Sequence, residues 1–502
     1  MNILLLSMPD SFEHTATVSM RMPNGALVSL AGNVDSHHRV AVADLILVQR
    51  RVRTTIEWLL RDLQPDVVGL SIMTFQRTTA QKVVKLVRTL HPRALIVVGG
   101  YDPSLATEVY EQPEWDLDVI VRGEGDITFR ELVRAIERGD TFHGIPGLSF
   151  RCGAGFVRTP ARPVSALTGD DIRLPNRAAR VLGGYTFIGR SIDVVETSRG
   201  CTYDCSFCSI IEMRGRNFHT WSIERTLADV ADARARGARA IFIVDDNITL
   251  NVARFEALCR AIVDAGLNDV DYIVQAMTSA IAARGAPLAR LMRAAGFRYV
   301  FLGIENILEQ DLTFLKARAK NATREGGRQT GNATITAIDV LHEHGMYVVG
   351  GLIVGNPDDT RESIETNLAF AREYVDWPYI QHPTPYPGTP MTKDFVERHL
   401  IVNDRMNEYD GTTAVVRSEH LDAEEIEFMR WRAERWMKLR HFWPVLRHSP
   451  GFVLRHGPQM VAHTFRGSTL RSLVGLESER KAFARYKALR RAEREYLADA
   501  PA

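Results

Sequence analysis

The sequence predicts an α/β protein in three parts: a doubly wound parallel sheet, a second array of strand–helix units, and a mainly helical C-terminal region. The first 150 residues alternate short apolar runs with amphipathic stretches, and a similar alternation returns after residue 190. Beyond about residue 400, helical patterns rich in tryptophan replace it. We therefore expect domains at 1–145, 191–400 and 401–502, with 146–190 as a linker rich in proline, glycine and arginine.

Composition and charge restrict the functional classes. Hydrophobic residues make up 45% of the 502 residues and charged residues 25%, which is typical of a globular protein with a large core. The net charge of +1 gives no chain-wide field that would attract nucleic acid. The N-terminal apolar run is too short for a signal peptide, and no window reaches the ~18 apolar residues of a membrane span. We expect a cytoplasmic protein with no membrane span and no nucleic-acid partner.

Five apolar runs near the N-terminus are expected to be buried parallel strands. They are Ile3–Leu6, Val40–Asp44, Val67–Ser71, Leu95–Gly99 and Val119–Val121. Helical spacing of apolar residues falls between them at Thr54–Leu63 and Thr78–Leu90. This order predicts a Rossmann-like sheet, whose ligand crevice lies beyond the carboxyl ends of the strands.

Small and hydroxyl-bearing residues stand at three of these strand ends. They are Ser71 and Thr74, then Gly99, Gly100 and Tyr101, then Gly123, Glu124 and Gly125. Glycine lets a ligand approach the backbone closely. The three ends together predict a crevice for a large, flat ligand.

Three cysteines lie within eight residues, at Cys201, Cys205 and Cys208. Soft thiolates this close together suit an iron–sulfur cluster or zinc. A closed structural zinc site requires a fourth Cys or His, and the nearest histidine, His219, is eleven residues beyond Cys208. Three ligands leave one metal position open to a group that is not protein. Cys152 and Cys259 are expected to be passive residues, and five cysteines arranged in this way favour a reducing compartment.

Six further strands are expected from the cysteine motif onward, with helical patterns between them. They are Ile192–Thr197, Ala240–Val244, Tyr272–Ala276, Tyr299–Ile304, Tyr347–Val354 and Tyr379–Gln381. Six such units predict a partial (β/α)₆, TIM-like barrel with its active site at the strand carboxyl ends.

The C-x₃-C-x₂-C run, with Phe207 before its last cysteine, resembles the signature of the radical S-adenosylmethionine (SAM) enzymes. Residues 1–145 resemble the cobalamin-binding domain that precedes the radical domain in the B12-dependent members of that family. The resemblance implies a [4Fe–4S] cluster on the three cysteines and SAM on the fourth iron. It also implies cobalamin, as methylcobalamin, at the ends of the N-terminal strands.

The resemblance implies roles for residues at the barrel strand ends as well. Asp245 and Asp246 are expected near the SAM amino group, although a helix N-cap after a strand is an equal alternative for either of them. Glu305 is expected to bond the SAM ribose or amino group. The stretch from Gly351 to Gly355 is expected to pack against adenine, with Asp358 in place of the family's glutamate.

One departure from the family concerns the lower ligand of cobalt. The Asp-x-His-x-x-Gly motif that supplies an axial histidine in many B12 proteins is absent. The nearest string runs from Asp35 through His37 and His38 into a strand and lacks the glycine. We expect cobalt without a protein histidine beneath it, and His37 and His38 at the surface.

The resemblance implies a B12-dependent radical SAM methyltransferase, which methylates an unactivated carbon by means of a 5′-deoxyadenosyl radical and methylcobalamin. One alternative is a cyclase, ring-contraction or rearrangement enzyme with the same cofactors. A second is a cobalamin-binding sensor with a structural metal site. No Ser/His/Asp array points to acid–base catalysis, so catalytic side chains stay unassigned.

Substrate and partners remain open. Lipids, tetrapyrroles, other natural products and peptides all occur as substrates in the family, and flavodoxin or ferredoxin supplies single electrons. In the C-terminal region, Trp431, Trp436 and Arg440 are candidates for substrate contact; the alternative is a solvated amphipathic helix packed by tryptophan.

Overall fold

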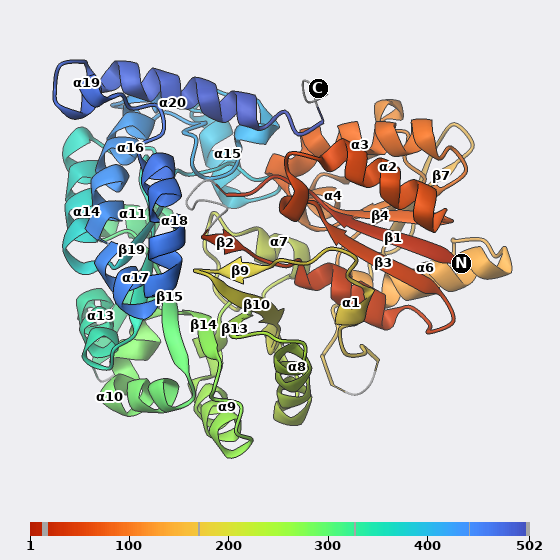
Figure 1. Cartoon of the computed structure of the whole chain (residues 1–502), viewed down its shortest axis with the longest axis horizontal. Helices are drawn as coiled ribbons and strands as arrows, with labels where there is room; N and C mark the ends of the chain where they lie inside the picture. The colour runs from red at the N-terminus through yellow and green to blue at the C-terminus, as the bar shows by residue number, and fades with distance from the viewer. Residues whose placement is uncertain (13–18, 169–170, 326–327, 441, 498–502) are drawn as a thin grey trace.

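The computed structural model describes residues 1–12, 19–168, 171–325, 328–440 and 442–497. Its N-terminal domain is a seven-stranded sheet in the order β3-β1-β4-β5-β6-β7-β8 (Figure 1). The first five strands in this order are parallel: β3 (Arg39–Asp44), β1 (Asn2–Ser7), β4 (Val67–Ser71), β5 (Leu95–Gly99) and β6 (Val119–Val121). These are the five predicted strands.

Helices cover both faces of this sheet, as a doubly wound fold requires. Helices α1 (Gly25–Asn33) and α6 (Gly125–Arg138) pack on one face, and α2 (Val52–Leu63) and α3 (Arg77–Leu90) pack on the other. The segment predicted as a linker begins with a hairpin of β7 (Leu148–Cys152) and β8 (Gly155–Arg158). This hairpin pairs antiparallel with β6, so the first sheet continues beyond residue 145.

The second sheet has eight strands in the order β19-β18-β15-β14-β13-β10-β9-β2. Six are parallel: β10 (Arg190–Val195), β13 (Ala240–Ile243), β14 (Asp271–Ala276), β15 (Phe297–Glu305), β18 (Tyr347–Ile353) and β19 (Trp377–Gln381). Short antiparallel β9 (Thr186–Phe187) and β2 (Met20–Arg21) complete one edge. The helices α8 (Ile223–Ala235), α9 (Val252–Asp264), α10 (Thr278–Ala294), α13 (Thr334–Glu343) and α14 (Arg361–Tyr374) lie along its outer side.

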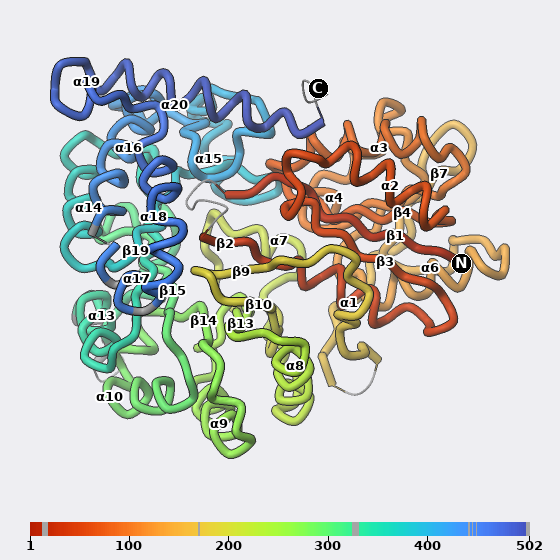
Figure 2. Tube along the Cα trace, viewed as in Figure 1, coloured from red at the N-terminus to blue at the C-terminus, as the bar shows by residue number. Residues whose placement is uncertain are grey.

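The C-terminal region is helical: α16 (Ala423–Arg440), α17 (Phe442–His448), α18 (Pro450–Thr464), α19 (Leu470–Leu473) and α20 (Glu479–Glu493). Figure 2 shows α20 running from the barrel back toward the N-terminal domain, where Glu495 Oε2 and Lys82 Nζ are 2.7 Å apart. The predicted fold class, with its Rossmann-like sheet, partial barrel and helical C-terminal region, is confirmed.

Candidate active site

The three cysteines lie on the loop between β11 (Ser198–Arg199) and α7 (Ser209–Arg214), and all three line one cavity. Gly200 begins the loop with a φ of +92°, and a Cβ there would lie 2.4 Å from the backbone oxygen of Asn217. Only glycine therefore fits this turn. Burial raises the pKa of the Cys205 thiol to about 12 and that of Cys208 to about 11.

The cavity has a volume of about 660 Å³ and extends from the cysteines into the barrel. No histidine and no other cysteine lines it among the described residues. Three thiols therefore face a shared space whose described lining offers no fourth thiol and no imidazole. This donor set fits a cluster that keeps one iron open, and it does not fit a closed zinc site. His219 pairs with Arg199 in the small β11–β12 sheet, with β12 at His219–Thr220, and does not line the cavity.

Polar groups gather at the cysteine end of this cavity. Lys320 Nζ donates a hydrogen bond of 2.6 Å to Glu305 Oε1, and both side chains are largely buried. Burial opposes the charge on Lys320, but the Glu305 carboxylate raises its pKa above the ordinary value. The sequence analysis did not find Lys320, because it comes from the short helix α12 (Arg318–Asn321), away from any strand end.

Glu305 is held in an uncommon backbone conformation. It is the last residue of β15 and has a φ of +61°, where the pairing of β15 with β18 shifts register. Along β15, alternate residues line the cavity: Tyr299, Phe301, Gly303 and Glu305. Side chains two apart share a face of a strand, so the wall changes from aromatic to ionic toward the carboxyl end.

The rest of the wall is mostly apolar. Its side chains include Phe187, Phe242, Ile273, Val349, Trp377 and Tyr379. Phe187 contacts the edge of Tyr299 with ring centroids 4.9 Å apart. The described lining carries only a few ionisable groups besides the cysteines and the Glu305–Lys320 pair, so the space away from the cysteines suits a hydrocarbon or aromatic ligand.

The two adjacent aspartates have different surroundings. Asp246 lines the cavity, and its Oδ2 accepts from the Gly200 N–H at 2.7 Å. Asp245 lines neither this cavity nor the second one described below. Its carboxylate accepts from the backbone N–H of Thr197 at 2.6 Å and from the hydroxyls of Thr197 and Ser198. Asp245 therefore positions the strand before the cysteine loop.

The two glycines of the Gly351–Gly355 stretch also have different surroundings, since Gly351 lies within β18 and Gly355 follows it. Gly351 lines the cavity, and a Cβ there would lie 2.7 Å from the Phe301 ring. Gly355 is outside the cavity lining and faces Ile426 of α16. Asp358, the residue expected in place of the family's glutamate, is exposed and pairs with Arg398. Its neighbour Asp359 is the buried carboxylate, and it accepts from the N–H of Gly355 at 2.7 Å.

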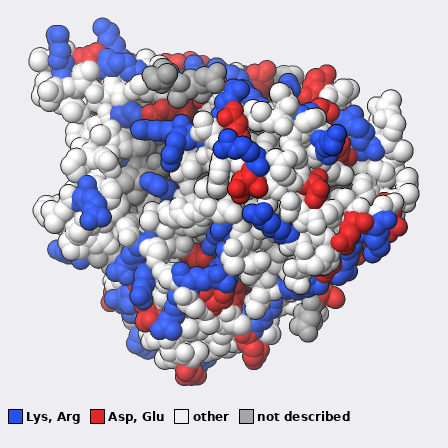
Figure 3. Space-filling view, turned by 45° about the vertical axis from the view of Figure 1, so that its right-hand side comes forward, with Lys and Arg blue, Asp and Glu red and all other residues white. Residues whose placement is uncertain are grey.

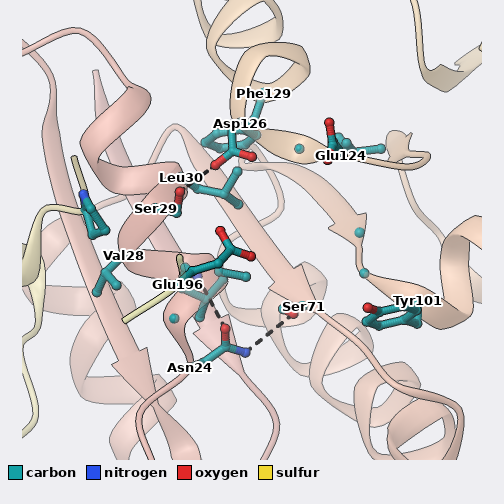
Figure 4. Close-up of a pocket in the computed structure, with 18 of the residues that line it drawn as sticks. Asn24, Val28, Ser29, Leu30, Ser71, Tyr101, Glu124, Asp126, Phe129 and Glu196 are labelled. Carbon is teal, nitrogen blue, oxygen red and sulfur yellow. Dashed lines mark hydrogen bonds between the residues drawn. The ribbon is translucent and has the colours of Figure 1, made fainter. Parts of the chain in front are cut away.

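A second cavity of about 420 Å³ lies between α1, α6 and the strand ends of the N-terminal sheet (Figure 4). It is lined by seven of the eight residues predicted at these strand ends, namely Ser71, Gly99, Gly100, Tyr101, Gly123, Glu124 and Gly125, and also by Asp246. A Cβ on Gly100 would lie 2.7 Å from the Ile72 carbonyl oxygen. Thr74 is the exception, since its hydroxyl donates to Asp102 Oδ1 at 2.9 Å and it lines neither cavity.

The residues that close this second cavity carry no local signal in the sequence. Asn24 and Ser29 of the α1 region line it, together with Asp126 and Phe129 of α6. Figure 4 shows Ser29 facing Asp126, and Ser29 Oγ donates to Asp126 Oδ1 at 2.5 Å. The barrel supplies the opposite wall through Val194, Glu196 and Arg199. The cavity therefore lies between the two domains.

Ion pairs join the domains around this cavity. Arg199 donates to Asp126 Oδ2 and to Glu196 Oε2, at 2.7 Å each, and Arg214 Nη1 is 2.8 Å from Glu124 Oε1. The sequence does not reveal that the charge of Arg199 is directed to these carboxylates. Burial raises the pKa of Glu196 to about 7 despite Arg199.

His37 and His38 lie far from both cavities. They precede β3, at the amino end of a parallel sheet whose carboxyl ends line the second cavity. Neither can reach a ligand there. His37 is exposed as expected, but His38 is buried, which the sequence analysis did not predict.

The C-terminal tryptophans also lie outside both cavities. Trp431 is buried against Phe428 and Phe483, and Trp436 is half exposed. The side chain of Arg440 is outside the described residues. The interpretation of α16 as a helix packed by tryptophan therefore accounts for Trp431.

Two family models match the chain in the order of its domains. The B12 binding domain matches residues 15–133, and the radical SAM superfamily matches residues 195–371, which include the cysteine loop. The chain belongs to the cobalamin-dependent radical SAM enzymes. As a member of this family it uses a [4Fe–4S] cluster, SAM and cobalamin.

Relatives of this radical SAM enzyme differ in the reactions for which they are named. An uncharacterized methyltransferase of Pyrococcus horikoshii is 28% identical over 85% of this chain and 90% of its own length. The anaerobic magnesium-protoporphyrin IX monomethyl ester cyclase of Cereibacter sphaeroides is 24% identical over 79% of this chain. The hopanoid C-3 methylase of Methylococcus capsulatus is 28% identical over 70% of it. The chain spans slightly less than two thirds of the last two relatives, at 63% and 65%.

Solved structures share the fold of this radical SAM enzyme. The methyltransferase TsrM from Kitasatospora setae, with cobalamin and a [4Fe–4S] cluster bound, has a TM-score of 0.62 at 21% identity, covering 80% of this chain and 79% of TsrM. The cobalamin-dependent enzyme OxsB has a TM-score of 0.63 at 17% identity, covering 99% of this chain and 72% of OxsB. In the described part of the chain, no helix is both long and apolar enough to cross a bilayer.

Proposed function

We propose that the protein is a cobalamin-dependent radical SAM methyltransferase that methylates a carbon atom of an apolar substrate. The observation that carries this proposal is the larger cavity, which joins three cysteine thiols at one end to an aromatic interior at the other. When bound, the cluster and SAM supply radical chemistry at carbon, and cobalamin supplies the methyl group.

The side chains around the larger cavity are assigned as follows in this proposal. Cys201, Cys205 and Cys208 hold the cluster. The Glu305–Lys320 pair and Asp246 bind the polar groups of SAM, because carboxylates attract its ammonium group and Lys320 its carboxylate. Gly351 leaves room for the adenine, and the aromatic wall holds the substrate and excludes water.

Cobalamin is assigned to the strand ends of the N-terminal domain. The second cavity takes its nucleotide tail, between α1 and the strand ends, and Ser71, Gly99, Gly100, Tyr101, Gly123, Glu124 and Gly125 contact it. The lack of a histidine at these strand ends, among the described lining residues, supports cobalt without a protein ligand below it. A ligand this large fits there because glycine removes side chains where the backbone comes closest.

The substrate class follows from the cavity wall. An aromatic and aliphatic surface stabilises a substrate by removing apolar area from water, at roughly 25 cal/mol per Å². It offers little to a highly charged substrate, whose ions would lose hydration without gaining partners. We propose an apolar small molecule or lipid. The hopanoid methylase among the relatives supports this class.

The experiment is an anaerobic incubation of the reconstituted protein with SAM that carries a deuterated methyl group. Apolar candidate substrates or a lipid extract are added, with a chemical reductant or reduced flavodoxin. The proposal expects a product whose mass has increased by a labelled methyl group, and no such product with Cys205→Ala. The relatives named as cyclases favour a second candidate, an oxidative cyclase, and a converted product without label would replace the first proposal with it.

The proposal also assigns the electron donor and the cellular compartment. A small one-electron donor such as flavodoxin or ferredoxin reduces the cluster, because a radical SAM cluster needs one electron at a time. The protein works in the cytoplasm, where a reducing environment keeps the three ligand thiols free of disulfides.

A further inference from the structure

The outer surface of the C-terminal helices exposes an unusual number of large apolar side chains. Nineteen large hydrophobic residues of the described chain are exposed, and nine of them lie between residues 436 and 476. The most exposed are Leu470 at 81%, Leu454 at 80%, Leu476 at 71%, Trp443 at 67% and Val474 at 65%. Single exposed apolar residues are ordinary, whereas a concentration of them marks an interaction surface.

The same segment has no negative charge. Residues 435–476 contain seven Lys or Arg, four His and no Asp or Glu. The chain as a whole has a net charge of +1, and Figure 3 shows both signs interspersed over the face it presents. Arg447, Arg455 and Arg471 are exposed and form no ion pair with any carboxylate that the structure describes. The segment is therefore both apolar and cationic.

The core does not require these outward side chains. The inner faces of α17 and α18 supply Val445, Phe452 and Val453, which pack in one cluster with Phe187 and Tyr299. Phe187 and Tyr299 also line the larger cavity. One layer of side chains thus separates that cavity from α17 and α18, and Leu454 and Val461 of α18 point away from it into solvent.

We propose that the outer surface of α17–α19 docks on an anionic lipid bilayer. Amphipathic helices with Trp and Leu beside Lys and Arg lie in the membrane interface, with apolar side chains at the acyl boundary and cations among the phosphates. A second copy of this chain fits poorly, since a symmetric contact would bring the exposed Arg447, Arg455 and Arg471 of one copy toward those of the other. Nucleic acid would leave the exposed leucines in water.

This docking does not depend on methyl transfer, and it gives the apolar cavity a source of substrate. A bilayer bound at α17–α19 lies next to the wall formed by Phe187 and Tyr299. No described helix is apolar enough to span the bilayer, so the contact is peripheral.

The test is flotation of the full-length, cofactor-loaded protein with two kinds of vesicle. One is phosphatidylcholine alone, and the other contains roughly a third phosphatidylglycerol. The protein is expected to float with the anionic vesicles and to be released by high salt. Two variants separate the contributions: Leu454→Ser with Leu470→Ser and Leu476→Ser, and Arg447→Gln with Arg455→Gln and Arg471→Gln. Each is expected to lower the bound fraction at least about tenfold.

The matched control changes two exposed apolar residues elsewhere, Val396→Ser with Val402→Ser, and should bind vesicles as the unmodified protein does. Iron content and melting temperature verify that every variant is folded. The proposal is overturned if the unmodified protein fails to float with anionic vesicles, or if neither variant set differs from the control. A dimer in light scattering that the leucine variant dissociates, without any vesicle binding, would assign the surface to self-association instead.

Discussion

Arg199 Nη1 donates to Asp126 Oδ2 at 2.7 Å, and this bond joins the strand before the cysteine loop to the first turn of α6 in the other domain. Asp126 in turn accepts from Ser29 of α1. The wall of the second cavity and the approach to the cysteines are therefore parts of one hydrogen-bonded unit. A change at Arg199 should affect both domains.

Replacing Arg199 with Met should weaken cobalamin binding. The change leaves the buried Asp126 carboxylate and the half-buried Glu196 carboxylate without their cation, and the lost partner of Asp126 costs about 3–5 kcal/mol in stability or domain closure. Cobalamin affinity is measured by titration followed in the visible spectrum. Arg260→Met, at an exposed arginine with a surface partner, serves as the control. Equal affinity in both variants would contradict the role given to this pair.

Removing any one of Cys201, Cys205 and Cys208 should abolish the cluster. Alanine at each position removes one thiolate from a three-ligand set, and no other cysteine or histidine lines the cavity in the described chain. Iron and sulfide are measured after anaerobic reconstitution. Cys152→Ala, at an exposed thiol, should retain the full cluster content. A single-cysteine variant with unchanged iron would show that the ligand assignment is incorrect.

Lys320→Met should weaken SAM binding by about tenfold to a hundredfold. The change leaves Glu305 buried without its partner and removes the cation beside the thiols. Affinity is measured by calorimetry on the cluster-loaded protein, and iron content is checked in parallel. Lys316→Met, at an exposed lysine nearby, should bind SAM normally. Retained affinity in Lys320→Met would remove this residue from the SAM site.

Variants of the two neighbouring aspartates should have different effects, one on the stability of the fold and the other on cofactor binding. Asp245→Asn disturbs three buried hydrogen bonds and should lower stability by about 1–3 kcal/mol. Asp246→Asn keeps an acceptor for Gly200 and should mainly weaken SAM binding. Thermal unfolding and SAM titration of both variants give the comparison. The reverse pattern would mean that Asp245, not Asp246, contacts the cofactor.

The free energy of unfolding should fall with rising pH because Asp10 titrates. This residue follows β1 and is buried. Burial raises the pKa of this carboxyl to about 7, despite a hydrogen bond from Thr79. The folded state therefore holds a proton that the unfolded chain releases. The stabilisation is complete below the unfolded pKa of about 4 and is lost as the pH rises through about 7.

The measurement is the apparent melting temperature between pH 5 and pH 8. It should fall by a few degrees more in the unmodified protein than in Asp10→Asn, at roughly 2–4 °C per kcal/mol for a domain of this size. Asp62→Asn, at an exposed carboxylate, is the control and should follow the unmodified protein. Parallel curves for all three proteins would show that Asp10 does not titrate in this range.

The sequence predicted those parts of the site that depend on local pattern. Parallel strands bring their carboxyl ends to one edge, so Ser71, Gly99 and Gly123 could be grouped before any coordinates were known. Residues whose role depends on tertiary contacts were missed. Lys320 lies fifteen residues after Glu305 on a short helix, and Arg199 meets Asp126 only when two domains close.

Shifts of one or a few residues account for the other differences between the sequence predictions and the structure. Asp358 and Asp359 are adjacent, and only the geometry of the turn after β18 decides that Asp359 is the buried one. Asp245 and Asp246 both follow β13, but Asp245 bonds to Thr197 while Asp246 lines the cavity. Gly355 has a φ of +98° and serves the turn, not the cavity wall.

The alternation along β15 has a consequence for how this enzyme can change over evolutionary time. Tyr299 and Phe301 come first, and Gly303 and Glu305 follow at the carboxyl end. In the proposed function, the early positions shape the space for the substrate, and the late ones lie at the cysteine end, where the cofactors react. A mutation at Tyr299 can admit a new molecule without moving Glu305. Substrate preference can therefore change in this fold while the residues at the cysteine end stay the same.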